Sequence, residues 1–182
     1  MSRISIPSVE QSLPAAQPLL AAVQQQLGVV PNLMKLVGHS PAALEGYLSL
    51  NGALAKASLN VGLRERIALA VAEYNGCDYC LSAHTYLGLH VAKLGQEEIS
   101  AARAGESSDA RSNAALRFAR SVAATRGQVS DAELAAVRAA GFGEAAVLEI
   151  VATVALNVLT NYINNVAQTD IDFPVVRAGA TA

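Results

Sequence analysis

Apolar residues recur along most of the chain with the three-to-four-residue spacing of amphipathic helices. Proline, glycine and asparagine, which commonly begin or end helices, separate the segments that follow this spacing. The pattern predicts helices over residues 19–27, 33–38, 41–58, 63–74, 78–94, 96–105, 109–126, 130–140 and 143–167. No segment shows the strict two-residue alternation of a half-buried strand, so we predict an all-α fold.

Several of these helices have capping residues at their expected first turns. Asn32 is placed to cap the short helix that follows it. Ser40 precedes Pro41, and proline is favoured at the first helical position. Ser130, followed three residues later by Glu133, matches a capping box.

The helices over 63–74 and 78–94 are joined by the turn signal Asn75-Gly76, which predicts a helical hairpin. A chain of 182 residues can form one domain with its own core and is too short for two comfortable ones. We therefore expect one compact helical domain over residues 1–182, built around the hairpin. Residues 1–31 form its N-terminal arm in this interpretation, and residues 172–182 an extended or loose tail.

Composition adds an expectation about assembly. Hydrophobic residues make up 52% of the chain and charged residues only 15%. The mean hydropathy is +0.32, which is high for a soluble monomer of this size. We expect part of this apolar surface to be buried between subunits of a homo-oligomer. The formal charge of -2, without a basic patch, argues against nucleic acid as a partner.

The distribution of apolar residues also bears on location. The N-terminus lacks the long apolar core of a secretory signal. The most apolar stretch, residues 145–159, contains Glu149 and Asn157 and is shorter than the ~20 residues that span a bilayer. We interpret it as a buried helix and expect a cytoplasmic protein that does not bind a membrane. In that reducing compartment a structural disulfide is not expected.

Candidate chemistry centres on Cys77 and Cys80, a C-x-x-C pair at the start of a predicted helix. The free N–H groups and positive dipole end of a helix start favour thiolate over thiol. Two intervening residues also let the pair close as a disulfide. His84 lies four residues after Cys80 on the same helix face, where its imidazole can accept or relay a proton.

A carboxylate joins this group if the hairpin closes as predicted. Antiparallel pairing around the turn places Glu65 opposite Tyr86, within one helical turn of His84. A carboxylate there would orient the imidazole and hold a proton. The alternative is a solvated charge between Arg64 and Arg66.

The spacing of these residues resembles a family signature. Glu65 is followed after eleven residues by Cys77-x-Tyr79-Cys80 and, after three more, by His84. This arrangement is similar to that of the alkylhydroperoxidase D branch of the carboxymuconolactone decarboxylase superfamily, in its peroxidase-related members. Residues 31–34, 39–41 and 157–162 are also similar to stretches of these proteins, so the likeness covers most of the chain.

The resemblance implies a compact helical fold that assembles as a homo-trimer or homo-hexamer. It also implies thiol-dependent reduction of an alkyl hydroperoxide or hydrogen peroxide, with no cofactor and no metal. Cys80 would be the thiol that the peroxide oxidises, Cys77 would resolve it as a disulfide, and Glu65 with His84 would relay protons. A dithiol such as a lipoyl group, or a thioredoxin-like protein, would reduce the disulfide. Tyr79 stands where the best-studied pattern has histidine, as a pocket wall or hydrogen-bond donor.

Other interpretations of the same residues remain open. In C-x-x-C pairs at helix starts the first cysteine is often the more acidic, which would make Cys77 the nucleophile; the nearby His84 makes us prefer Cys80. The two cysteines with His84 and Glu65 could bind zinc, in a redox-sensing or zinc-stabilised oligomer without turnover, or the dithiol could be buried and inert. A decarboxylase acting on a lactone acid is a third possibility, although that branch does not use a C-x-x-C pair.

The remaining polar residues of note are interpreted as structural. Asn157, Asn161, Asn164 and Asn165 fall at helical spacing and are expected to make interhelical hydrogen bonds or subunit contacts. His39 precedes a helix cap and is expected to be structural, and His90 to be structural or at an interface.

Overall fold

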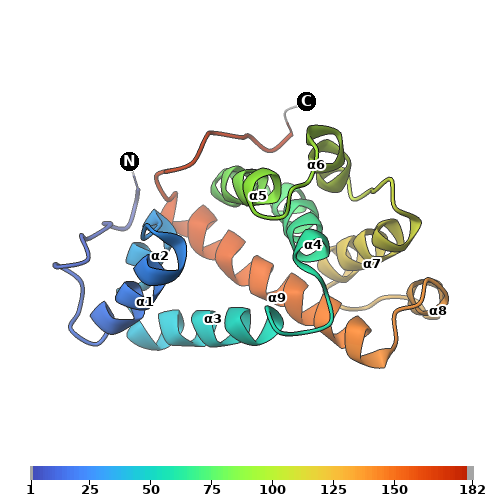
Figure 1. Cartoon of the computed structure of the whole chain (residues 1–182), viewed down its shortest axis with the longest axis horizontal. Helices are drawn as coiled ribbons and strands as arrows, with labels where there is room; N and C mark the ends of the chain where they lie inside the picture. The colour runs from blue at the N-terminus through green and yellow to red at the C-terminus, as the bar shows by residue number, and fades with distance from the viewer. Residues whose placement is uncertain (1, 180–182) are drawn as a thin grey trace.

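The computed structural model describes residues 2–179, which form nine helices and contain no strand. The all-α prediction is therefore confirmed for this part of the chain. The helices are α1 (Gln17–Leu27), α2 (Asn32–Val37), α3 (Pro41–Leu54), α4 (Val61–Tyr74), α5 (Asp78–His90), α6 (Gln96–Arg103), α7 (Ala110–Thr125), α8 (Asp131–Ala139) and α9 (Glu144–Ala167). Figure 1 shows α9 crossing the whole molecule, with α3 along one side and α4 and α5 on the other.

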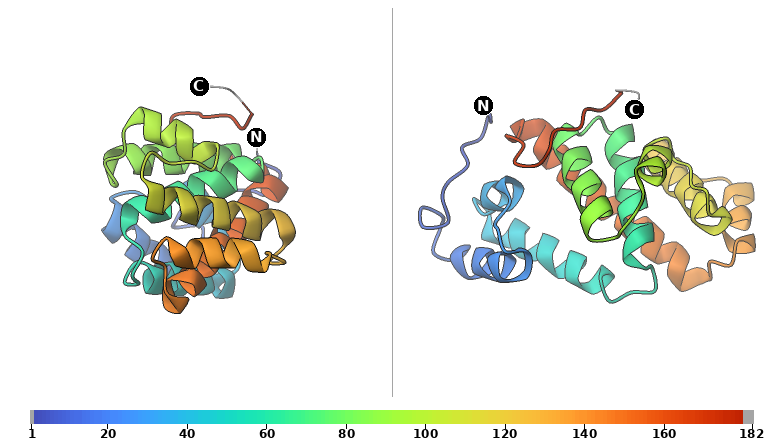
Figure 2. Two further views of the ribbon diagram at one scale, coloured as in Figure 1. Left: turned by 90° about the vertical axis from the view of Figure 1, so that its right-hand side faces the viewer. Right: turned by 45° about the horizontal axis from the view of Figure 1, so that its top comes forward.

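Helix α4 lies at the centre of the packing and contacts α5, α6, α7 and α9. Ile67, Leu69 and Val71 are fully buried, and alanines alternate with them over residues 68–72. The small alanine side chains let neighbouring helices approach α4 closely on several sides, so the residues of α4 are held firmly. The two views in Figure 2 show α4 enclosed by these neighbours.

The predicted hairpin is formed by α4 and α5. Gly76 adopts a φ of +61°, a left-handed conformation that glycine takes without steric cost. Cys77 then becomes the N-cap of α5, because its sulfur accepts a hydrogen bond from the backbone N–H of Cys80 at 3.3 Å. The turn therefore fixes the cysteine pair at the start of the helix, as the sequence predicted.

Helix α5 ends at His90, four residues earlier than predicted. Lys93 takes a left-handed φ of 57°, and the N–H of Leu94 bonds back to the carbonyl of Gly88 at 2.9 Å. This bond closes over six positions, one more than in a Schellman motif, and the left-handed residue inside it ends the helix. The predicted end at residue 94 missed this closure, because lysine carries no sequence signal for a left-handed conformation.

Helix α3 also ends early, at Leu54 rather than near residue 58. The guanidinium of Arg64 donates hydrogen bonds to the carbonyls of Leu54 at 3.2 Å and Leu59 at 2.7 Å. These bonds stabilise the turn between α3 and α4 in place of a further helical turn. The start of α3 is as predicted, with the hydroxyl of Ser40 accepting from the N–H of Ala43.

The predicted cap at Asn32 is wrong, because Pro31 is the N-cap of α2 and Asn32 is its first helical residue. The backbone N–H of Asn32 instead donates to the carboxylate of Asp172 at 2.7 Å. A residue distant in sequence therefore satisfies this helix start. The capping box of α8 is confirmed, with Ser130 and Glu133 bonding each other reciprocally.

The C-terminal tail is extended, as predicted, but it is not loose. Figure 1 shows it lying along α5. The N–H of Val176 donates to the hydroxyl of Ser82 at 2.9 Å, and Arg177 pairs with Asp78 at 2.7 Å. These bonds hold the tail over the start of α5. Residues 180–182 of the predicted tail lie outside the described residues.

Helix α9 is long and apolar enough, by length and composition, to cross a membrane, and 50% of its most apolar stretch is buried inside the protein. The core helix of a soluble protein passes the same test, so this is weak evidence for a membrane span. Its contacts with α3, α4, α5 and α7 agree with the predicted buried helix.

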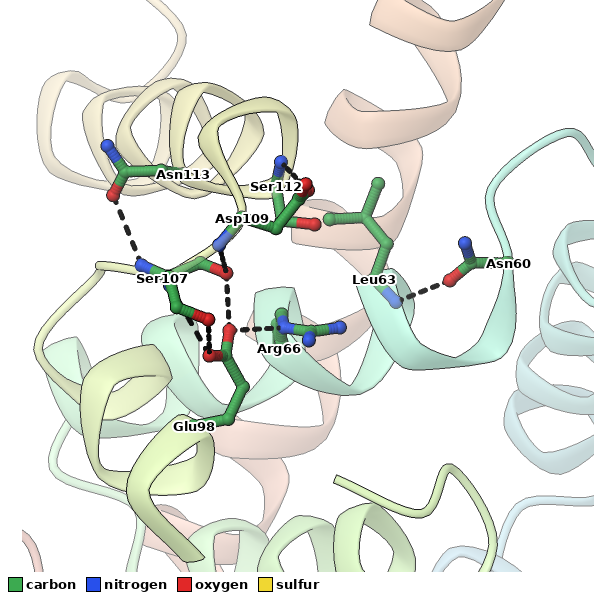
Figure 3. Close-up of polar contacts among 9 residues, drawn as sticks. Asn60, Leu63, Arg66, Glu98, Ser107, Asp109, Ser112 and Asn113 are labelled. Carbon is green, nitrogen blue, oxygen red and sulfur yellow. Dashed lines mark hydrogen bonds and ion pairs between the residues drawn. The ribbon is translucent and has the colours of Figure 1, made fainter. Parts of the chain in front are cut away.

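A polar cluster fixes the start of α4 against α6 and α7 (Figure 3). The carboxylate of Glu98 accepts a hydrogen bond from Arg66 at 2.8 Å and from the hydroxyl of Ser108 at 2.7 Å. The hydroxyl of Ser107 donates to the same carboxylate. We call Arg66, Glu98, Ser107 and Ser108 the Glu98 cluster.

Candidate functional site

The structure brings together the residues that the sequence singled out on the hairpin. Oε2 of Glu65, on α4, lies 2.8 Å from Nδ1 of His84, on α5. His84 is one helical turn from Cys80, and Cys77 precedes the same helix. The geometry contains the expected carboxylate–imidazole contact beside the cysteine pair, whereas the catalytic roles of these residues stay predictions.

Glu65 is not a solvated charge between two arginines. Arg64 turns to the end of α3 and Arg66 to Glu98, so neither pairs with it. Only 15% of the Glu65 side chain is exposed, compared with 22% for His84. Three consecutive residues of α4 thus face three different neighbours, and the middle one faces the site.

Both cysteines are free thiols enclosed by protein, with exposures of 0% for Cys77 and 3% for Cys80. The sulfur of Cys80 accepts a hydrogen bond from Nδ2 of Asn164, on α9, at 3.3 Å. Three helices therefore build the site: α4 supplies the carboxylate, α5 the thiols and imidazole, and α9 an amide.

The pKa values of the two thiols are shifted in opposite directions. Burial raises the pKa of Cys80, but hydrogen bonding with Cys77 and the positive charge of His84 act against it. Hydrogen bonding to Asn164 and Asn161 lowers it further, and the pKa of Cys80 is about 7. The pKa of Cys77 is raised far above its usual range. The largest cause is the hydrogen bond of its thiol to Cys80, and burial is the second. Cys80 is therefore the sulfur favoured as a nucleophile at neutral pH.

The imidazole is set to carry a positive charge. Burial disfavours the protonated form of His84, yet the charge and hydrogen bond of Glu65 raise its pKa above the ordinary value. The negative charge of Cys80 adds to this rise. The Glu65 carboxylate thus stabilises the His84 imidazolium, which in turn stabilises the Cys80 thiolate. This arrangement favours proton transfer at His84.

Tyr79 both bounds the site and donates a hydrogen bond. Its hydroxyl donates to Asp172 at 2.8 Å and accepts from the N–H of Leu33 at 3.1 Å. Burial raises the pKa of Tyr79, so the phenol keeps its proton. Tyr79 also lines a cavity of about 460 Å³ together with Asn164. Asp172, which sequence reasoning set aside as tail, orders this wall.

Sequence reasoning missed the contributions of three further residues to the site. The helical pattern does not single out Tyr47, on α3; burial raises its pKa to about 12, and the negative charges of Glu65 and Cys80 contribute. Its phenol therefore lies within electrostatic reach of the site and stays protonated. Asn161 and Asn164 were expected to make structural contacts; their signal was the presence of amides on an otherwise apolar helix.

The other two histidines lie apart from the cysteines, in agreement with their expected structural roles. The ring of His39 donates to the carbonyl of Ser5 at 2.8 Å. The ring of His90 packs against Tyr86 with centroids 4.4 Å apart. Across residues 2–179, no group of three or more histidine, cysteine, aspartate or glutamate side chains is arranged to hold a metal ion.

The fold and this site define a class, the all-helical proteins with a dithiol at the start of a core helix. The family model of the carboxymuconolactone decarboxylase family matches residues 41–125, which include the whole hairpin. Together with the structural neighbours described next, this match supports a place for the chain in the alkylhydroperoxidase D-like branch of the carboxymuconolactone decarboxylase superfamily.

Several solved structures share the fold. One, an alkylhydroperoxidase AhpD core described as a peroxidase-related protein from Ralstonia eutropha JMP134, is 25% identical. The match covers 94% of this chain and 92% of that one, with a TM-score of 0.84. A peroxidase-related protein from Silicibacter sp. TM1040 is 21% identical, covering 93% and 91% of the two chains with a TM-score of 0.81.

The fold also includes a different activity. The debrominase Bmp8, solved with 2,3,4-tribromopyrrole as a cysteine-to-alanine variant, is 21% identical. The match covers 92% of this chain and 94% of that one, with a TM-score of 0.75. Among curated proteins there is no match.

Proposed function

We propose that this protein is a thiol-dependent peroxidase that reduces alkyl hydroperoxides or hydrogen peroxide through a Cys77–Cys80 disulfide cycle. One observation carries the proposal: Cys80 is an enclosed thiol with a pKa of about 7, beside a second thiol and a His84 whose pKa is raised by Glu65. Such a sulfur is a substantial fraction thiolate at neutral pH, and the thiolate is the reactive form.

In the first step the Cys80 thiolate attacks the terminal oxygen of the hydroperoxide. The S–O bond forms as the O–O bond breaks, which oxidises the sulfur by two electrons to sulfenic acid. The alkoxide or hydroxide that leaves takes a proton from the imidazolium of His84. Glu65 keeps His84 protonated for this transfer, because its carboxylate accepts the Nδ1–H at 2.8 Å.

In the second step the Cys77 sulfur attacks the sulfenic acid of Cys80. The S–S bond forms, the S–O bond breaks, and the hydroxyl leaves with the Cys77 proton as water. Hydrogen bonding between the two thiols, which lowers the pKa of Cys80, supports this attack because it requires the sulfurs to lie close together. A dithiol, either a lipoyl group or a thioredoxin-like protein, then reduces the disulfide and is itself oxidised.

The test is peroxide consumption by the purified protein with a panel of donors: dihydrolipoamide, thioredoxin with its reductase, and glutathione. We expect turnover of hydrogen peroxide or an alkyl hydroperoxide with at least one dithiol. Parallel reactions with 2,3,4-tribromopyrrole and with a carboxymuconolactone test the activities of other superfamily members. Turnover of either compound without any peroxide turnover would overturn the proposal.

We further propose a homo-trimer or homo-hexamer in the reducing cytoplasm. Helix α9 leaves a row of apolar side chains on the surface of the single chain, with Leu148 69%, Tyr162 58% and Val166 65% exposed. Such a row is suited to burial against another subunit. Analytical ultracentrifugation should give three or six times the chain mass of 18.8 kDa, and a monomer at micromolar concentration would contradict this.

A further inference from the structure

Two buried asparagines of helix α9 lie beside the cysteine pair. The proposed disulfide cycle does not use them. Nδ2 of Asn164 donates to the sulfur of Cys80 at 3.3 Å. Asn161, fully buried, also lowers the pKa of Cys80. The two asparagines are three positions apart, so their side chains share one face of the helix and can act on the same sulfur.

The amide of Asn161 is held in one orientation. Its Oδ1 accepts a hydrogen bond from Nδ2 of Asn75, in the α4–α5 turn, at 2.9 Å. The backbone carbonyl of Asn75 in turn accepts from Asn165 at 2.9 Å. With its oxygen engaged by Asn75, Asn161 has its two N–H donors left for other partners. Asn75 is thus a positioning residue, acting on the sulfur only through Asn161.

Each of the two amides keeps one atom unpaired. Among the described residues, Nδ2 of Asn161 and Oδ1 of Asn164 are buried without a well-formed hydrogen bond. Buried amides that serve packing alone are normally satisfied, as is the N–H₂ of Asn157, which donates to the carbonyl of Thr153 at 2.8 Å. An unpaired donor and an unpaired acceptor beside one sulfur suit a ligand atom that both accepts and donates.

We propose that Asn161 and Asn164 form an amide pair that stabilises the thiolate of Cys80 and then binds the oxygen that this sulfur acquires. Amide donors favour the charged thiolate over the thiol. A sulfenic acid S–O–H group could accept from Asn161 and donate to Asn164, which would satisfy both unpaired atoms. The binding of oxygen rests on the proposed peroxidase function, whereas the stabilisation of the thiolate does not.

A cavity reaches one member of the amide pair. Asn164 lines the cavity of about 460 Å³ that also contacts Tyr79 and Thr169. The hydroxyl of Thr169 is a further buried group without a hydrogen bond in the described residues. A polar molecule that enters this cavity meets Asn164, the residue that contacts the Cys80 sulfur.

The test measures the pKa of Cys80 without peroxide. The rate of alkylation of the reduced protein by iodoacetamide is followed from pH 5 to 10, and mass spectrometry identifies the modified cysteine. Asn164→Leu should move the midpoint upward by about one pH unit, which lowers the rate at pH 6 about tenfold. Asn161→Leu should shift it in the same direction by a smaller amount, because its hydrogen bond is less well formed.

Asn157→Leu is the matched control, since it removes a buried amide from the same helix away from the sulfur and should leave the midpoint unchanged. If Asn164→Leu does not fold, as judged by circular dichroism, the near-isosteric variant Asn164→Asp is used for the same alkylation measurement. It replaces the donor with a negative charge and should raise the midpoint further. Folded Asn164 variants with the wild-type midpoint would overturn the proposal.

The oxygen-binding half has its own measurement. In a Cys77→Ser background the Cys80 sulfenic acid cannot be resolved and can be trapped with dimedone after one equivalent of peroxide. Asn161→Leu should shorten its lifetime several-fold, whereas Asn157→Leu should not. An unchanged lifetime would overturn this half. If no sulfenic acid forms in any variant, the proposed function fails, while a shifted alkylation midpoint still establishes the amide pair.

Discussion

Two polar clusters flank α4, and they differ in how fully their hydrogen bonds are made. In the Glu98 cluster both carboxylate oxygens accept bonds, from a guanidinium and from the Ser107 and Ser108 hydroxyls (Figure 3). Desolvation raises the pKa of Glu98, yet these bonds lower it to about 2. The cluster therefore has one protonation state at neutral pH and one arrangement.

In the cluster around Cys80, by comparison, some hydrogen bonds are not made. It holds a thiol with a pKa of about 7 and two amide atoms without well-formed hydrogen bonds. Unpaired buried groups lower stability, so a protein retains them where a reaction uses them. The contrast suggests a division on this fold: the saturated polar cluster fastens helices together, whereas the unsaturated cluster is the one that we propose to be reactive. The variants below test this division, in order of decreasing expected effect.

The cysteines should show the largest effect. Cys80→Ser replaces the attacking sulfur with a hydroxyl that is not ionised at neutral pH, and peroxide turnover should fall at least ~10³-fold. Cys77→Ser should allow one oxidation and then stall as sulfenic acid, detectable as a mass increase of one oxygen atom. Unfolding of both variants should stay close to wild type, because serine is similar in size. Steady turnover in both variants would refute the disulfide cycle.

Glu65→Gln should give the next largest effect. Without the carboxylate the pKa of His84 falls, the imidazolium is lost near neutral pH, and the pKa of Cys80 rises. We expect the rate of peroxide reduction at pH 7 to fall about 10²-fold, with the lower limb of the pH–rate profile moving from about pH 7 to higher values. Glu73→Gln, on the same helix but paired with Arg103, is the control and should keep the profile.

The hairpin and its charged pair could be predicted from sequence because short-range rules determine them. The turn at Asn75-Gly76 and the helical period fix the register that sets Glu65 against His84. The confirmed caps at Ser40 and Ser130 are equally local. Reasoning of this kind depends only on residues a few positions apart along the chain.

The missed features depend on residues far apart in the sequence. Asp172 satisfies the start of α2 from 140 positions away. Asn164 reaches Cys80 across 84 positions, and no local pattern states which face of α9 meets the cysteines. The early end of α3 was missed for a different reason, since it depends on a side chain only ten positions away, Arg64, folding back over the turn. Long-range packing decides these contacts.

Glu98→Gln tests the other side of the comparison. It should lower the free energy of unfolding by about 2 kcal/mol at pH 7, because a charge-assisted network loses its anion. The folded-state pKa is depressed to about 2, so the contribution is present above the unfolded value near 4.5 and is lost as the pH falls toward 2. Urea denaturation from pH 7 to 2.5 should show wild type and variant converging.

The alkylation midpoint of Cys80 should not move in Glu98→Gln. The exposed neighbour Glu97 supplies the control, since Glu97→Gln should leave both unfolding and alkylation unchanged. If Glu98→Gln shifts the midpoint by a full pH unit, the two clusters are coupled through α4 and their division fails.

Tyr79 lies next to the Cys80 cluster but makes structural hydrogen bonds, and Tyr79→Phe should have the smallest effect. The change removes the hydroxyl that donates to Asp172 and accepts from the N–H of Leu33, leaving a buried N–H unpaired. We expect a loss of about 1 kcal/mol in urea denaturation, with less than a twofold change in peroxide turnover. Tyr74→Phe, with an exposed side chain, should change neither quantity. Tyr79 adjoins Cys80 in the sequence. An altered alkylation midpoint in Tyr79→Phe would therefore show that this hydroxyl acts on the Cys80 thiol and is not only a structural hydrogen-bonding group.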